Sequence, residues 1–129
     1  MDEAGTRAFV KRFFDAIEQG DVDTVASCYT DDVGIWHNFD DKVQSRDENL
    51  ATLRGMVTRI SDRVYDERQV EVFDGGFVQQ HVLHGTRKDG SRVSLPAAII
   101  CRFRDGKIAR LDEYLDSAQV AVFRQTFDS

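Results

Sequence analysis

The first half of the chain carries apolar residues three or four positions apart, which is the period of an amphipathic α-helix. This spacing predicts a helix that ends at Gly20 and a second, short helix capped by Asp21. A third helix is expected to begin at the capping box that Ser45 forms with Glu48. Between the second and third helices, the stretch "VGIWHN" (33–38) is expected to form a short strand.

From Val64 onward, apolar and polar residues alternate, which is the period of a half-buried strand. Asp-Gly pairs at 74–75, 89–90 and 105–106 separate the alternating runs, and such pairs are strong hairpin signals. We therefore expect a meander of four antiparallel strands, followed by a short helix capped by Ser117. This order predicts an α+β fold in which a cone-shaped, curved antiparallel sheet wraps around three to four helices.

Composition narrows the class of protein. The 129 residues suit one domain spanning 1–129, and 41% hydrophobic with 31% charged residues indicates a soluble globular chain. The net charge of −6 and the lack of a basic block argue against nucleic acid or an anionic membrane as a partner. No apolar run is long enough to span a bilayer, and the acidic start is unlike a signal peptide. Cys28 and Cys101 fit buried free thiols, so we expect a cytoplasmic location.

A twisted sheet wrapped over helices encloses a conical hollow, and such concave apolar spaces are the usual small-molecule sites. Strand alternation places Gln79, His81 and Leu83 on one face, and Glu113 is the only charge on its face of the last strand. His84 faces the opposite way from His81, so the two histidines cannot share a metal ion. No metal-ligand cluster and no phosphate-binding loop occur in the sequence, and we expect no metal and no cofactor.

The opening strand ends in a wide aromatic and two polar side chains. Alternation places His37 on one face and Trp36 with Asn38 on the other, unless a bulge intervenes. We interpret the three as the lip and wall of the hollow, where Trp36 supplies apolar surface and Asn38 a hydrogen bond to the substrate.

Three side chains carry the expected chemistry. His81 is the expected general base, because the ordinary histidine pKa lies near neutrality, with Glu113 as its orienting group or the acid, and His37 as a second acid–base group. Each has a structural alternative. His81 could simply bond a neighbour, Glu113 could pair with Arg102 or Arg92, and His37 could sit at a solvated strand end.

Two stretches carry a family resemblance. "FFDAIEQGDVDTVASCYTDDVGIWHN" (13–38) resembles the opening of the nuclear transport factor two-like superfamily, and "DGKIARLDEYLD" (105–116) resembles the closing strand of its SnoaL-like members. The resemblance implies a cystatin-like, cone-shaped α+β barrel, usually dimeric, that holds a ligand in the cone. This fold hosts isomerases, cyclases, dehydratases, epoxide hydrolases and non-enzymes.

Ketosteroid isomerases of this superfamily use a tyrosine on the first helix, an aspartate base at the end of the first strand and a second carboxylic acid. This chain has Phe13 at the first position, His37 at or beside the second and Ile99 at about the third. The usual oxyanion pair is therefore missing, and the resemblance implies that Phe13 and Ile99 contact substrate instead.

Limonene epoxide hydrolases use an Asp–Arg–Asp set with a tyrosine and an asparagine. Glu113 matches one aspartate, His81 takes the arginine position and Leu83 the other aspartate position, while Trp36 and Asn38 lie near the tyrosine and asparagine. SnoaL-like cyclases use histidine with a carboxylate as an acid–base pair, which matches the residues here better.

The sequence thus favours a cofactor-independent acid–base enzyme, an isomerase, cyclase, dehydratase or hydrolase, acting on a hydrophobic oxygenated small molecule. The alternative is a non-catalytic domain of the same fold that binds a small molecule or another protein. A homodimer is expected through the outer sheet face, whose apolar residues are predicted to be Val78, Val82, Ile108 and Tyr114.

Overall fold

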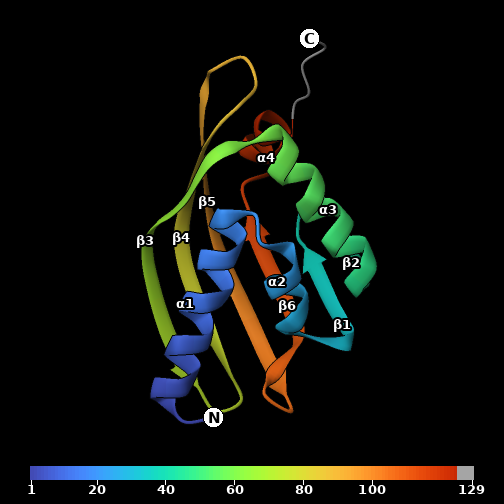
Figure 1. Ribbon diagram of the computed structural model, residues 1–129, viewed down its shortest axis with the longest axis vertical. Coiled ribbons are helices and arrows are strands. Elements are labelled where there is room, and N and C mark those ends of the chain that lie inside the picture. Colours follow the sequence, from blue (N-terminus) through green and yellow to red (C-terminus); the bar gives the residue numbers. More distant parts are fainter. Residues whose placement is uncertain (125–129) are drawn as a thin grey trace.

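The computed structural model describes residues 1–124 and contains four helices and one six-stranded sheet (Figure 1). The helices are α1 (Glu3–Gln19), α2 (Val22–Ser27), α3 (Arg46–Arg59) and α4 (Ser117–Phe123). The strands are β1 (Tyr29–His37), β2 (Lys42–Gln44), β3 (Ser61–Phe73), β4 (Gly76–Thr86), β5 (Arg92–Arg104) and β6 (Lys107–Leu115). The predicted α+β class is confirmed.

The strands lie in the order β2-β1-β6-β5-β4-β3, and the sheet is not closed into a barrel. Every neighbouring pair is antiparallel except β1 and β6, which run parallel. The predicted antiparallel meander is present, and the parallel pair makes the sheet as a whole mixed. The parallel pair brings the end of β1 beside the C-terminal part of β6, which positions the site described below.

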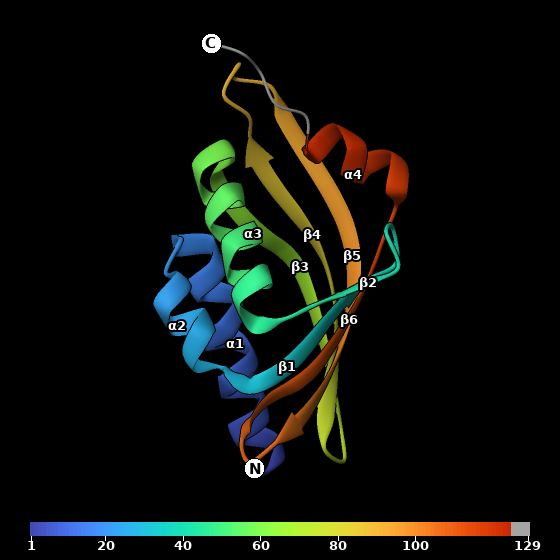
Figure 2. The same cartoon turned by 90° about the vertical axis from the view of Figure 1, so that its right-hand side faces the viewer.

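The sheet curves, and α1, α2 and α3 cover its concave face, while α4 lies near one end of β5 (Figure 2). The core between these layers contains buried aromatic residues from helix and strand alike, such as Phe13, Phe14 and Phe77. None of the helices in residues 1–124 is both long and apolar enough to cross a membrane.

Local signals in the sequence set most of the element boundaries. Gly20 ends α1 in the left-handed region, with φ of 74°, and Ser45 and Glu48 form the predicted capping box of α3. Asp105 and Gly106 both have positive φ, as a two-residue type I′ hairpin turn requires. The last helix differs slightly from expectation, because Asp116 rather than Ser117 accepts the capping hydrogen bond.

A bulge in β6 changes which side chains face the core. Arg102 pairs with Arg110 and Phe103 with Ile108, so Ala109 is an extra residue on β6. The bulge turns Ile108 inward, where it is fully buried, and the prediction that it lies on the outer face was wrong. Tyr114, beyond the bulge, is 48% exposed on the convex side, as expected.

Candidate functional site

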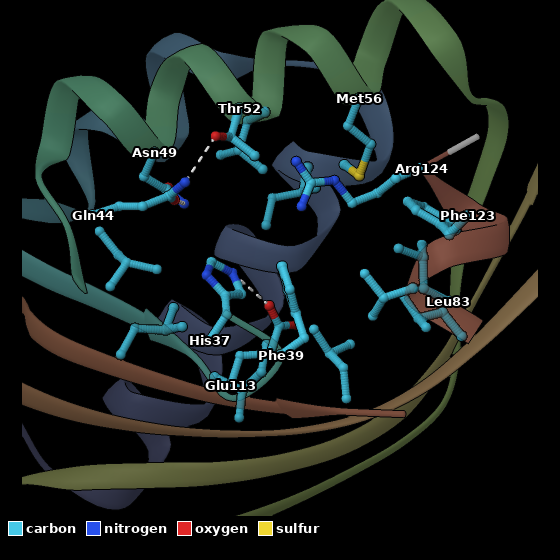
Figure 3. Close-up of a pocket in the computed structure, with 18 of the residues that line it drawn as sticks. His37, Phe39, Gln44, Asn49, Thr52, Met56, Leu83, Glu113, Phe123 and Arg124 are labelled. Atoms are coloured by element: carbon cyan, nitrogen blue, oxygen red, sulfur yellow. Dashed lines mark hydrogen bonds and ion pairs between the residues drawn. The ribbon is translucent and has the colours of Figure 1, made fainter. Parts of the chain in front are cut away.

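A cavity of about 160 Å³ opens between α3, α4 and the concave face of the sheet (Figure 3). Apolar side chains from every layer line it, including Phe13, Ile35, Leu83, Leu95, Ile99 and Leu111. Its size is similar to that of an apolar protein cavity of about 150 Å³ that admits benzene. The predicted positions Phe13, Leu83 and Ile99 therefore lie in the lining, and their contact with substrate remains a prediction.

His37 and Glu113 lie within hydrogen-bond distance of each other inside this cavity, with 3.0 Å between His37 Nε2 and Glu113 Oε1. The parallel register places the two residues directly opposite each other, His37 at the end of β1 and Glu113 in β6. Their side chains are only 12% and 18% exposed, so the pair is screened far less by water than a surface pair would be.

The pair leaves the other ring nitrogen of His37 available. No described residue bonds Nδ1, and this nitrogen points away from Glu113 (Figure 3). When Glu113 is ionised and accepts the Nε2 proton, Nδ1 carries the lone pair of the neutral imidazole. The Phe39 ring, 5.3 Å from the imidazole centroid to centroid, packs against the histidine and restricts its orientation.

A chain of hydrogen bonds lines the opposite wall of the cavity. The Tyr29 hydroxyl donates to Asn49 Oδ1 at 2.8 Å, Asn49 Nδ2 donates to Gln44 Oε1 at 3.1 Å, and Gln44 Nε2 donates to Thr52 Oγ1 at 3.0 Å. Burial raises the pKa of Tyr29 well above its ordinary value, so its hydroxyl stays protonated. These contacts fix β1, β2 and α3 relative to one another beside His37.

Tyr65 of β3 is a second buried phenol in the lining. Burial, together with the charge of Glu113, raises the pKa of Tyr65, which keeps its hydroxyl protonated as a donor. That hydroxyl bonds no other residue in the described part of the chain. The cavity thus offers a proton acceptor at His37 and an unused proton donor at Tyr65.

His81 occupies a different place from the one predicted. It is 3% exposed, its ring packs on Phe14 and Tyr65, and Gln79 Nε2 lies 2.9 Å from its Nδ1. Burial lowers the pKa of His81 to about 4, against a smaller opposing effect of the Glu113 charge. The predicted contact between His81 and Glu113 does not occur among residues 1–124, and Glu113 pairs with His37 instead.

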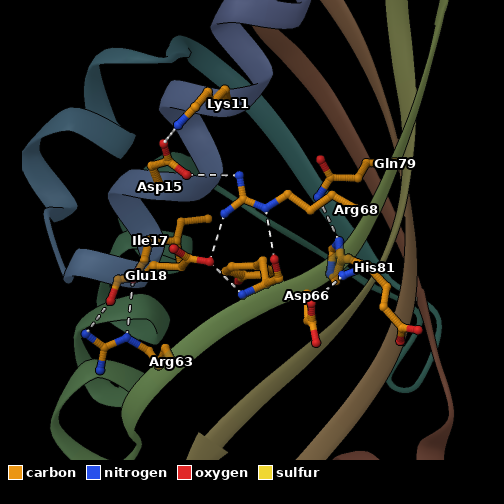
Figure 4. Close-up of polar contacts among 11 residues, drawn as sticks. Lys11, Asp15, Ile17, Glu18, Arg63, Asp66, Arg68, Gln79 and His81 are labelled. Atoms are coloured by element: carbon orange, nitrogen blue, oxygen red, sulfur yellow. Dashed lines mark hydrogen bonds and ion pairs between the residues drawn. The ribbon is translucent and has the colours of Figure 1, made fainter.

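The environment of His81 is held by contacts between α1 and β3 (Figure 4). Arg68 donates to Asp15 at 2.9 Å and to Glu18 at 2.8 Å, and Glu18 also accepts from the Tyr65 backbone N–H at 2.7 Å. These bonds hold the Tyr65 ring edge-on against the imidazole. The structure therefore agrees with the structural alternative for His81, a histidine that is hydrogen-bonded to a neighbouring side chain.

Trp36 and Asn38 lie outside the cavity lining. Trp36 Nε1 donates to Asp41 Oδ1 at 2.8 Å, and its ring packs edge-on against Tyr114, 5.2 Å away, on the convex side of the sheet. Asn38 Nδ2 donates to the Leu115 carbonyl at 3.0 Å, and the Leu115 N–H donates to Asn38 Oδ1 at 2.8 Å. The Asn38 side chain thereby extends the pairing of β1 with β6 by one residue. The prediction that Trp36 and Asn38 line the cavity was wrong.

Several lining residues were not anticipated: Tyr29, Asn49, Tyr65, Arg59 and Arg124. The sequence holds a signal for one group, because five residues of α3 line the cavity along one face of the helix at three- and four-residue spacing: Asn49, Thr52, Leu53, Met56 and Arg59. In the part of the chain that the structure describes, no three His, Cys, Asp or Glu residues gather closely enough to hold a metal ion.

Solved structures share this fold. A candidate polyketide cyclase from Xanthomonas campestris pv. campestris superposes with a TM-score of 0.82 at 19% identity, covering 92% of this chain and 96% of that one. AclR, a candidate hydroxylase from Streptomyces galilaeus, gives 0.83 at 16% identity, covering 94% and 96%. An LEH-like epoxide hydrolase from M. tuberculosis gives 0.76 at 18% identity, covering 92% and 87%.

No match was found among curated proteins. At the sequence level, the SnoaL-like domain matches residues 10–111, which include β1, most of β6 and the strands between them. This match extends over more than half of the chain, and the structural neighbours have the same arrangement of sheet and helices. The chain therefore belongs to the SnoaL-like domain family, within the nuclear transport factor two-like superfamily.

Proposed function

We propose that this protein is a cofactor-independent acid–base enzyme that moves a proton on a hydrophobic, oxygenated small molecule. The observation that carries the proposal is the His37–Glu113 pair, 3.0 Å apart in an apolar cavity. A histidine held by a carboxylate has a fixed tautomer and a stabilised charged form, which are the properties a general base needs.

In the proposed reaction, Nδ1 of His37 removes a proton from a carbon beside a carbonyl group of the substrate. The electron pair of the broken C–H bond moves onto the carbonyl oxygen, giving an enolate. Glu113 stabilises the imidazolium that forms, and the Tyr65 hydroxyl donates a hydrogen bond to the enolate oxygen. If a double bond is conjugated with the enolate, return of the proton from His37 Nδ1 to the far carbon of that double bond shifts the double bond and completes an isomerisation. If the enolate carbon instead attacks a second carbonyl, the new C–C bond closes a ring, and the alkoxide that forms takes the proton back from His37 Nδ1.

The chemistry can be tested without knowing the natural substrate. A small ketone of about the size of the cavity, 2-indanone, exchanges its α-protons for deuterium in D₂O when a base acts on it, and ¹H NMR follows the loss of signal. We expect exchange above the buffer rate for the wild-type protein. His37→Gln and Glu113→Gln should each reduce it by about 10²-fold or more, the usual contribution of a positioned base.

His84→Gln is the matched control, because His84 bonds Ser94 and lies outside the cavity lining. It should exchange 2-indanone at the wild-type rate. If His37→Gln and His84→Gln behaved alike, the assignment of His37 would be wrong. Binding of 2-indanone by the wild-type protein without any exchange would favour the non-catalytic binding domain.

A further inference from the structure

Two arginines reach the cavity from opposite walls at the end where α3 and α4 face each other. Arg59 is the last residue of α3, and Arg124 follows the last turn of α4. In Figure 3 the Arg124 side chain extends across the cavity between Met56 and Phe39, on the side of the cavity away from Glu113. Both belong to the lining that also contains His37 and Glu113.

Neither guanidinium is neutralised by a residue in the described part of the chain. Within residues 1–124, Arg59 and Arg124 form no ion pair, whereas Arg68 and Arg104 do. The Nε atom of Arg59 is shielded from solvent and has no hydrogen-bond partner. A buried donor without a partner is unfavourable, and such groups are usually satisfied in the functional state.

A glycine in α3 leaves space for the Arg59 guanidinium, although glycine lowers the stability of a helix. Gly55, one turn earlier in α3, is a residue that lowers helix stability relative to alanine. A Cβ atom at position 55 would lie 3.0 Å from Nη1 of Arg59. The missing side chain therefore leaves space in which this guanidinium lies along α3.

Arg124 is oriented by an aromatic ring. Its guanidinium carbon lies 5.5 Å from the centroid of the Phe39 ring, a cation–π contact that leaves the N–H groups at the guanidinium edge free to donate. Phe39 also packs against His37 at 5.3 Å between ring centroids. One ring thus links the proton-transfer pair to the cationic end of the cavity.

The carboxylates of the lining do not neutralise the two arginines. The lining holds two carboxylates, Glu113, which pairs with His37, and Asp40, whose Oδ1 accepts from the Lys42 backbone N–H at 3.1 Å. Although the whole chain carries a net charge of −6, the two arginines form no ion pair with either carboxylate. An anionic ligand is the partner that would satisfy them.

We propose that Arg59 and Arg124 bind a carboxylate group of the substrate, so that the substrate class is an apolar carboxylic acid. A carboxylate matches the planar fork of donors on a guanidinium, and the apolar walls suit the remaining carbon skeleton. Held at this end, the skeleton extends toward His37 and Tyr65. The proposal rests on the proposed function for the orientation of the substrate, but the anion site itself is independent of catalysis.

Isothermal titration with two probes of nearly equal shape, 4-tert-butylbenzoate and its neutral amide, tests the proposal. We expect the wild-type protein to bind the benzoate at least about tenfold more tightly than the amide, with a preference that weakens as salt is added. Arg59→Gln and Arg124→Gln should each remove most of this preference while leaving the affinity for the amide unchanged. Gly55→Ala should weaken benzoate binding by displacing the Arg59 guanidinium.

Two controls separate this proposal from the proton-transfer chemistry. Arg54→Gln changes an exposed arginine of the same helix outside the lining and should keep the wild-type preference. His37→Gln should also keep it, although the same change should strongly reduce exchange of 2-indanone. Equal affinity of the wild-type protein for the two probes, including no measurable binding of either, would overturn the anion site. So would an unchanged preference in both arginine variants.

Discussion

Acidification should destabilise the fold through His81, a histidine that the proposed chemistry does not use. His81 is 3% exposed and is enclosed by Phe14, Tyr65 and Gln79. Protonation would place a positive charge in this apolar setting near the guanidinium of Arg68, and only the charge of Glu113 opposes the effect. Burial therefore lowers the pKa of His81 to about 4 from its ordinary 6.5.

The size and sign of the effect follow from the difference between the two pKa values. Each pKa unit is worth about 1.4 kcal/mol, so the depression corresponds to about 3 kcal/mol. Between pH 6.5 and pH 4 the unfolded chain binds a proton at this position and the folded chain does not. The free energy of unfolding should therefore be largest above about pH 6.5 and fall by about 3 kcal/mol as the pH drops toward 4.

Urea unfolding followed by the fluorescence of Trp36, the single tryptophan, measures this free energy at a series of pH values. His81→Gln removes the titrating group, so its free energy of unfolding should vary less with pH than that of the wild-type protein, by about 3 kcal/mol over this range. Carboxylates with lowered pKa values, such as Asp15 and Asp32, contribute equally to both proteins and cancel in the comparison.

His84→Gln, which changes the histidine on the other face of β4, should retain the steep dependence on pH. Parallel curves for wild type and His81→Gln would refute the reasoning, because they would mean that His81 titrates alike in the folded and unfolded chains. An NMR titration of the His81 ring with a midpoint near 6.5 would refute it independently.

Three further predictions concern other parts of the molecule. Asn38→Leu should lower the free energy of unfolding by about 1–3 kcal/mol in urea titrations, because both side-chain hydrogen bonds to the Leu115 backbone are lost; an unchanged value would mean that these bonds contribute nothing. Cys28 and Cys101 are fully buried with raised pKa values, so neither should react with a thiol reagent until urea unfolds the chain, and rapid labelling of the native protein would contradict this. The chain should sediment as a homodimer formed through the convex sheet face, where Tyr114 is 48% exposed, and Tyr114→Arg should give monomers; a wild-type protein that is monomeric at micromolar concentration would contradict the prediction.

Features with a local cause could be predicted from the sequence. The capping box at Ser45 and the turn at Asp105–Gly106 depend only on a few neighbouring residues, and both form as expected. Strand alternation correctly placed His81 and Glu113 on inward faces. Alternation also correctly placed Trp36 and His37 on opposite faces of β1. The error was the interpretation that both side chains line the cavity, which two opposite faces cannot do.

Features that depend on distant parts of the chain could not be predicted in the same way. Alternation says that a side chain faces inward, but not whether a helix packs on it there. His81 faces α1, whose Phe14 fills the space above it, whereas His37 faces the gap between α3 and α4. The parallel pairing that joins His37 to Glu113, and the bulge at Ala109, also need the assembled sheet.

The parallel joint between β1 and β6 has a consequence for how the protein becomes active. The strands from β3 to β6 are connected by hairpins and can pair as each one leaves the ribosome, since their contacts are close in sequence. β1 is synthesised early and can pair with β2, but its other edge has to wait for β6, the last strand of residues 1–124, before it is paired. The histidine and its carboxylate therefore meet only when the non-local closure of the sheet is complete, so an incomplete chain can contain most of the sheet and still lack the pair on which proton transfer depends.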